Sequence, residues 1–357
     1  MIDKIQDSPN ANWFLHGSGS VGNFPNVIRS FMGRDAISLL LCNLIKNNGV
    51  ACKTALLPAY ACPEVSEVFE KWGFKVIYYD TLMFRADRGQ VEQVLEKNEI
   101  GIYYFIDYFG IIQHSNQEII DVVKRASLRT FVIEDRAHYL CDKEIFENVD
   151  AYVFSFRKLL PIPEGGGVLT DVPIEYGYKK RMISNVLAVV MVLKKILLKH
   201  NPRFSRASLS KHGISRTAGS TTILAPSAMS LRIIDKVDIN DEIAMRKRLF
   251  AKYLERAKSA GLMPLFEELK DGDIPQGFPI ITKDATAIQY EMNRQGMYLK
   301  RHWKLSDDFK QVAPAAYSLS KKVITLPIYR GIYEEDIGKI IEKLMEIPCA
   351  KTEQGDC

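Results

Sequence analysis

The chain has 357 residues, of which 47% are hydrophobic and 25% are charged, as in an ordinary folded protein, and this length suggests two domains. The net charge of +5 is small for this length, so nucleic acid is a weak candidate partner. The six cysteines form no CxxC pair and no short Cys/His spacing, so no metal site is expected. Scattered cysteines and a polar start in place of a secretory leader favour a cytoplasmic location.

The first half of the chain alternates between short apolar stretches and amphipathic ones. Strands are expected at 55–57, 74–79, 100–106, 130–133, 151–156 and 168–170, and helices at 34–46, 63–72 and 117–126. This alternation indicates an α/β fold with a mainly parallel sheet flanked by helices. Ligands of such sheets bind beyond the carboxyl ends of the strands, here near 58–60, 107–108, 134–135 and 155–158.

The segment Met182–Leu193 is nearly all apolar and is followed by Lys194 and Lys195. Its 12 residues are too few to span a bilayer, so no stable insertion in a membrane is expected. We expect a helix that is buried or that faces a partner subunit. A helix lying on a membrane surface is the alternative.

The pattern changes near residue 230. Helices are expected at 240–259, 284–295 and 334–345, and strands at 277–282 and 322–327. This indicates a smaller α+β domain at the C-terminus. We place the large domain, with an irregular N-terminal lead-in, at 1–235 and the small domain at 236–357.

An acid and a lysine are expected to face the same crevice. Asp135 and Lys158 lie 23 residues apart, which fits one crossover between two strands, with each residue just past the end of its strand. Pyridoxal phosphate needs such a pair, because a lysine binds its aldehyde and an acid keeps its pyridine nitrogen protonated. The alternative is an ordinary surface salt bridge.

Short stretches resemble those of a known family, in the same order. They are Gly33-Arg34-Asp35-Ala36, Leu57-Pro58-Ala59-Tyr60, Val132-Ile133-Glu134-Asp135-Arg136-Ala137-His138, Ser155-Phe156-Arg157-Lys158, Gly165-Gly166-Gly167-Val168-Leu169-Thr170 and, before the last helix, Leu326-Pro327-Ile328. Together they resemble the DegT/DnrJ/EryC1/StrS family of sugar aminotransferases, which has the aspartate aminotransferase fold (fold type I). The resemblance covers about residues 28 to 345.

The resemblance implies roles for three catalytic residues. Lys158 would bind pyridoxal phosphate covalently, and Asp135 would pair with the pyridine nitrogen of the cofactor. His138 stands where the family has Gln or His near the ring hydroxyl.

The resemblance also places the cofactor phosphate at a helix N-terminus. The backbone amides at Gly33, Arg34 and Asp35 and the hydroxyl of Ser155 would hold it, since the helix dipole favours an anion there. The family usually has small hydroxyl residues where this chain has Arg34 and Asp35, and a carboxylate beside a phosphate is repulsive. Asp35 is therefore expected to point away from the phosphate, or to have its charge offset by Arg34.

Other positions carry weaker similarity to the family. Tyr60 or Cys62 stands where an aromatic residue usually stacks on the cofactor ring, and Tyr60 is the better chemical candidate. His302, with Arg301 beside it, resembles a segment whose histidine approaches the substrate. The alternative for this segment is a solvated basic turn.

The function implied by the resemblance is that of a homodimeric aminotransferase. It would transfer an amino group from a small-molecule donor, glutamate, to a keto-sugar nucleotide for surface polysaccharide or related sugars. Lys158 favours transamination, because the dehydratases of the family have histidine there. Arg136 and the compact stretch before Lys158 depart from most sugar aminotransferases. A non-nucleotide keto substrate, or another reaction of the same cofactor, therefore stays open.

A remote alternative is a nicotinamide-dependent oxidoreductase. The stretch Gly17–Gly22 matches the GxGxxG fingerprint of dinucleotide binding. That fingerprint should follow a strand and open a helix, whereas Pro25 follows closely here. We interpret the stretch as a flexible glycine-rich lead-in.

Overall fold

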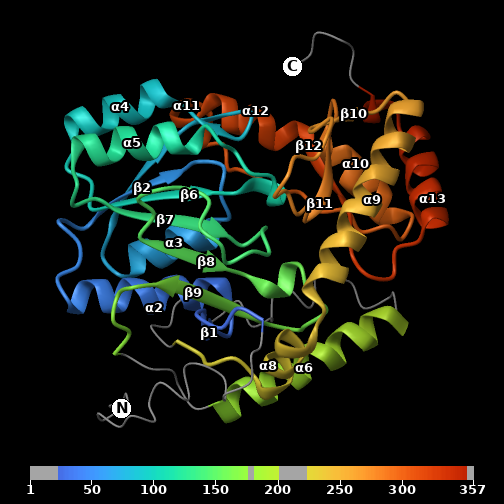
Figure 1. Cartoon of the computed structure of the whole chain (residues 1–357). Helices are drawn as coiled ribbons and strands as arrows, with labels where there is room; N and C mark the ends of the chain where they lie inside the picture. Colours follow the sequence, from blue (N-terminus) through green and yellow to red (C-terminus); the bar gives the residue numbers. More distant parts are fainter. Residues whose placement is uncertain (1–22, 176–180, 201–222, 352–357) are drawn as a thin grey trace.

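The computed structural model describes residues 23–175, 181–200 and 223–351. Figure 1 shows a large sheet between helices, and a smaller sheet with helices of its own. The stretch Gly17–Gly22, which matches the nicotinamide fingerprint, lies outside the described residues.

The large sheet has seven strands. Their spatial order is β1 (Ile28–Ser30), β9 (Gly166–Thr170), β8 (Ala151–Phe154), β7 (Phe131–Arg136), β6 (Ile102–Ile106), β2 (Thr54–Pro58) and β3 (Lys75–Tyr79). Strands β3, β2, β6, β7 and β8 run parallel, whereas β9 is antiparallel to both of its neighbours. The sheet confirms the predicted α/β fold with a mainly parallel sheet.

Helices cover both faces of this sheet. They are α2 (Gly33–Lys46) and α3 (Pro63–Lys71) on one face, and α4 (Arg88–Lys97) and α5 (Asn116–Ala126) on the other. Successive strand residues point to opposite faces, so Tyr104 of β6 packs in the first core and Tyr103 in the second. Helix α4 was not predicted, although Val91, Val94 and Leu95 have helical spacing and pack in the second core.

The second sheet has three antiparallel strands. They are β10 (Met263–Pro264), β11 (Gly277–Ile281) and β12 (Val323–Pro327), and they are packed with α9 (Ile239–Ser259), α10 (Ala285–Arg294) and α13 (Glu334–Met345) around a core of their own. The predicted helices and strands of the C-terminal part are therefore present. The domain boundary after residue 235 stays a prediction.

Polar contacts join these parts, among them contacts of the buried side chains of Asp80 and Arg246. The carboxylate of Asp80, which follows β3, accepts hydrogen bonds from the backbone N–H groups of Ala315 (2.9 Å) and Ala316 (2.8 Å), at the start of α12 (Pro314–Lys322). Arg246 of α9 is buried and paired with Glu242 at 3.0 Å, and it donates to the backbone carbonyl of Leu159 at 2.5 Å. The second contact reaches the residue directly after Lys158.

The apolar segment forms a longer helix than expected, α6 (Arg181–His200). In this chain it is not a buried helix: Met182 and Val186 are 71% and 59% exposed, while Ser184 and Ala188 are buried. Of the two expected arrangements, a helix buried within the chain is wrong, while a helix that faces a partner subunit stays a prediction. No helix in the described part of the chain has the length and apolar character needed to cross a membrane.

The close approach of α2 to the sheet depends on Gly166 in β9. A Cβ atom at this position would lie 2.3 Å from the carbonyl carbon of Met32 and 2.5 Å from the backbone nitrogen of Gly33. Both atoms belong to the backbone at the start of α2, so no side-chain movement could relieve the overlap. Glycine at 166 therefore fixes where the helix N-terminus lies on the sheet.

We predict that Gly166→Ala lowers the free energy of unfolding by about 2–4 kcal/mol, because the first turn of α2 must move away from β9. Urea unfolding followed by circular dichroism measures this. Gly338→Ala is the matched control, since a Cβ there meets nothing within 4 Å and alanine favours the helix α13. Equal stability of the two variants would contradict the assigned role of Gly166.

Candidate active site

A cavity lies at the carboxyl ends of β7 and β8 and contains the predicted acid and lysine together. Its lining consists of Met32, Gly33, Arg34, Ile37, Cys62, Glu64, Val65, Asp135, Ala137, Val153, Ser155, Arg157, Lys158 and Trp303. Asp135 is in β7, and Lys158 ends the short 3-10 helix η2 (Phe156–Lys158) that follows β8. The parallel pairing of β7 with β8 sets Asp135 opposite Val153 and brings both groups to one edge of the sheet.

Asp135 is buried and held in one orientation. Its Oδ1 accepts a hydrogen bond from the backbone N–H of Ala137, and its Oδ2 accepts one from the hydroxyl of Tyr104, each at 2.7 Å. Burial raises the pKa of this carboxyl, while the nearby charge of Lys158 and the two hydrogen bonds oppose that rise. Sequence reasoning missed Tyr104, although its place on the neighbouring parallel strand could have indicated it.

Lys158 is half-buried beside this carboxylate. Burial lowers the pKa of its ammonium group, and the charge of Asp135 acts in the opposite direction. The Nζ atom lies 5.6 Å from the centre of the Trp303 ring. The lysine is thus close to an acid and an aromatic face, in a setting that favours release of its proton.

The N-terminus of α2 forms another wall of the cavity. No side chain caps this helix, and a Cβ added at Gly33 would lie 3.4 Å from the Cβ and 3.7 Å from the Oγ of Ser155. Backbone amides and a hydroxyl therefore converge at a helix N-terminus, where an anion is favoured. Arg34, also on this wall, pairs with Glu64 at 3.1 Å.

Asp35 points away from the cavity. It is buried, it does not line the cavity, and its Oδ1 accepts a hydrogen bond from the backbone N–H of Leu224 at 3.2 Å. Burial raises the pKa of this carboxyl to about 6. The structure thus has the first of the two arrangements expected for Asp35.

His138 is buried behind the cavity and stacks on Trp303, with 5.3 Å between ring centroids and 17° between the planes. Its Nδ1 accepts a hydrogen bond from the backbone N–H of Phe109 at 3.2 Å. Burial holds the pKa of this imidazole well below its usual range, so the ring is neutral and Nε2 carries the proton. Among the described residues, Nε2 has no hydrogen-bond partner.

Tyr60, the favoured candidate for an aromatic residue that stacks on the cofactor ring, does not line the cavity. Cys62 lines the cavity, whereas Tyr60 lies fully buried, with its ring centre 5.9 Å from that of Trp303. Trp303 is the aromatic residue that lines the cavity, and sequence reasoning missed it. Its position next to His302, in a stretch that was already compared with the family, was the available signal.

The two candidate substrate residues, His302 and Arg301, make different contacts. His302 is buried, is 3.0 Å from Thr325 Oγ1 through its Nδ1, and has its ring centre 5.1 Å from that of His138. Arg301 donates to Thr286 Oγ1 at 2.7 Å and to the carbonyl of Ser320, and it does not line the cavity. The solvated basic turn is therefore wrong for His302, and Arg301 is tied to the smaller sheet region.

The residues of the cavity fit pyridoxal phosphate. Asp135 offers a carboxylate for a protonated pyridine nitrogen, and Lys158 offers an amine for the aldehyde. Gly33 and Ser155 offer donors for a phosphate, and Nε2 of His138, which stacks on the cavity residue Trp303, is a donor without a partner among the described residues. The orphaned donor is an independent sign that this group is missing a polar partner.

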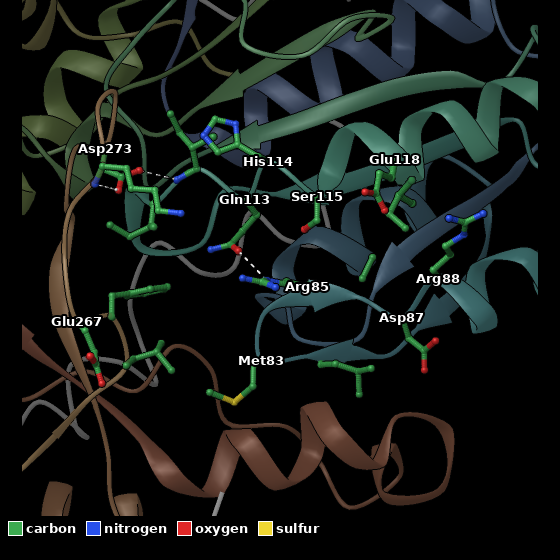
Figure 2. A pocket seen from close by; sticks show the side chains of 18 of the residues that line it. Met83, Arg85, Asp87, Arg88, Gln113, His114, Ser115, Glu118, Glu267 and Asp273 are labelled. Carbon is green, nitrogen blue, oxygen red and sulfur yellow. Dashed lines mark hydrogen bonds between the residues drawn. The ribbon is translucent and has the colours of Figure 1, made fainter.

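A second and larger cavity lies elsewhere, as Figure 2 shows. It runs along the hairpin of β4 (Thr81–Leu82) and β5 (Arg85–Ala86), where Gln113 accepts from Arg85 at 3.4 Å. Basic and acidic side chains alternate around it, and none of the predicted site residues lines it. The candidate active site is therefore the smaller cavity.

The fold is similar to solved structures of aminotransferases. A DegT DnrJ EryC1 StrS aminotransferase from Brucella abortus matches 94% of this chain and 89% of its own, at 16% sequence identity and a TM-score of 0.58. Spr1654 of Streptococcus pneumoniae, named as a sugar aminotransferase and solved in its PLP form, matches over 88% and 85%, at 16% identity and 0.59. DesI, solved with its TDP-sugar product, matches over 95% and 85%, at 16% identity and 0.63. The chain shares the fold of these enzymes, fold type I.

Neither a comparison with models of protein families nor a search of curated proteins finds a match to this chain.

The raised pKa of Asp35 gives a pH-dependent stability. The folded protein favours the protonated carboxyl, so the cost of ionising it is absent below pH ~4 and develops fully as the pH rises through about 6. We predict that Asp35→Asn, which keeps the acceptor for Leu224, is more stable than the wild type at pH 8 by about 2–3 kcal/mol and equally stable at pH 4. Urea unfolding at both pH values measures this, with the exposed Asp271→Asn as control. A difference that does not change with pH would contradict it.

Proposed function

We propose that this chain is a pyridoxal-phosphate-dependent aminotransferase. One observation carries the proposal: Lys158 and Asp135 line the same cavity, beside the uncapped N-terminus of α2. The fold shared with aminotransferases, one of them solved in its PLP form, supports it. The nicotinamide alternative rests on the Gly17–Gly22 stretch alone, which lies outside the described residues.

The residues around the cavity divide the work of the reaction. Bound pyridoxal phosphate supplies an electron sink for the pair of electrons left when the amino donor loses its α-proton. Lys158 would hold the cofactor through Nζ, and the same atom would take up the donor's α-proton, which its lowered pKa favours. Asp135, held by Tyr104 and Ala137, keeps a positive charge on the ring nitrogen.

Other residues orient the cofactor. His138 would donate from Nε2 to the ring hydroxyl, while Ser155 and the amides at the start of α2 would hold the phosphate. Trp303 shields the reacting centre from water on the side of Lys158. A neutral His138 suits this role, since it adds no positive charge that would compete with the ring nitrogen.

The proposed acceptor is a keto-sugar nucleotide and the proposed donor is glutamate. DesI, which shares the fold, was solved in the presence of its TDP-sugar product. His302, next to His138 and Trp303, is the candidate substrate residue, whereas the contacts of Arg301 direct it elsewhere. Surface polysaccharide or related sugar biosynthesis, a cytoplasmic location and a homodimer complete the proposal. A non-nucleotide keto acceptor is the alternative.

The covalent lysine is tested by absorbance and mass spectrometry. We predict that the protein with pyridoxal phosphate is yellow, and that borohydride bleaches it and leaves the cofactor attached to Lys158. Lys158→Ala should lose both signals, while Lys97→Ala, exposed on α4, should keep them. Attachment of the cofactor to another residue would refute the assignment.

The role of Asp135 is tested separately. Asp135→Asn should still bind the cofactor and become yellow, because the amide keeps the contact with Tyr104. Its turnover should fall by about 100-fold or more, since the ring nitrogen loses its counter-charge. An unchanged turnover number would place the acid outside the mechanism.

The substrate is tested with a panel of keto-sugar nucleotides and glutamate, followed by release of 2-oxoglutarate. We predict release with at least one of these acceptors and none without an acceptor beyond a single turnover. Simple keto acids form the comparison set. Turnover with keto acids alone would favour the non-nucleotide alternative.

A further inference from the structure

Helix α6 exposes its large apolar side chains. On the described part of the helix these are Met182, Ile183, Val186, Val189, Val190 and Leu193, each 45–71% exposed. At about 100° per residue they lie within a stripe roughly 120° wide along one side of the helix. These six residues are called the α6 stripe below. Isolated exposed apolar residues are common, but a continuous stripe marks an interaction surface.

The opposite side of the helix is attached to the protein. Ser184 and Ala188 are buried, and Leu187 and Met191 pack on Phe31, Met32 and Leu224. Asn185 accepts a hydrogen bond from the backbone N–H of Ala228, at the start of α8 (Ala228–Lys236), at 2.9 Å. These contacts fix the rotation of the helix, so the α6 stripe faces outward. Figure 1 shows α6 beside α8 at the lower edge of the molecule.

The charged residues in the sequence of α6 are all basic. Helix α6 contains Arg181, Lys194, Lys195 and Lys199 and no acidic residue. The whole chain has a net charge of only +5. The four basic residues of α6 account for +4 of it, so the positive charge is concentrated in the helix that contains the α6 stripe.

We propose that α6 docks on the surface of an anionic phospholipid bilayer. The helix would lie parallel to the surface, with the α6 stripe at the boundary between headgroups and acyl chains, and the basic residues of α6 would attract the anionic headgroups. A second copy of the chain fits less well, because a symmetric contact through α6 would bring two positively charged helices together. This inference does not depend on the proposed chemistry at Lys158.

The test uses the purified full chain and vesicles that are separated by flotation. Binding to vesicles of phosphatidylcholine mixed with phosphatidylglycerol should exceed binding to pure phosphatidylcholine by about 10-fold or more, and high salt should reduce it. Val190→Glu and Val189→Glu should each weaken binding by about 10-fold or more, since they place a negative charge in the α6 stripe. Leu128→Glu, at a site 85% exposed just after α5, is the matched control and should bind like the wild type.

Light scattering and thermal melting on the same proteins complete the test. If Val190→Glu melts early, Val190→Ser replaces it and should still weaken binding. Equal recovery of wild-type protein with both kinds of vesicle would overturn the proposal. So would a wild type that ignores vesicles and forms a dimer that Val190→Glu converts to a monomer, since a second copy would then cover the α6 stripe. The cofactor attached at Lys158 should be unchanged in all variants, which separates this outcome from failure of the proposed function.

Discussion

The candidate site depends on one electrostatic arrangement: an amine and a carboxylate share a cavity in which burial disfavours the charge of each. Neither charge is well tolerated there alone, and each favours the charged form of the other. The sheet makes this possible, because parallel pairing of β7 and β8 brings both groups to the same edge. Tyr104 on the next strand then fixes the carboxylate.

Aromatic rings complete the arrangement on the side away from the sheet. Trp303 lies between Lys158 and His138, and His302 meets His138 edge to face. Burial lowers the pKa of both imidazoles, so this wall is neutral although it is rich in nitrogen. The cavity therefore combines charged groups at the sheet edge with an uncharged, polarisable wall facing them. That contrast suits a planar, positively charged aromatic ligand.

Much of the fold and part of the site could be predicted from the sequence. Local sequence patterns were enough to predict that Asp135 and Lys158 lie at strand ends and that Gly33 lies at the start of a helix. Contacts between distant segments were not predictable in this way: Trp303 reaches the cavity from the other end of the chain. Tyr60 was favoured over Cys62 on chemical grounds, but backbone direction decides which of them lines a cavity. The helical form of α6 was predicted, but an apolar sequence does not reveal whether its apolar side is covered within the chain.

The guanidinium of Arg246 links the smaller sheet region to the residue that follows the candidate reactive lysine. It extends from α9, binds carbonyls of the smaller sheet region, and also holds the carbonyl of Leu159. A rigid displacement of the smaller sheet region would therefore pull on the peptide unit next to the reactive lysine. Arg246 thus couples the position of the smaller sheet region to that of Lys158.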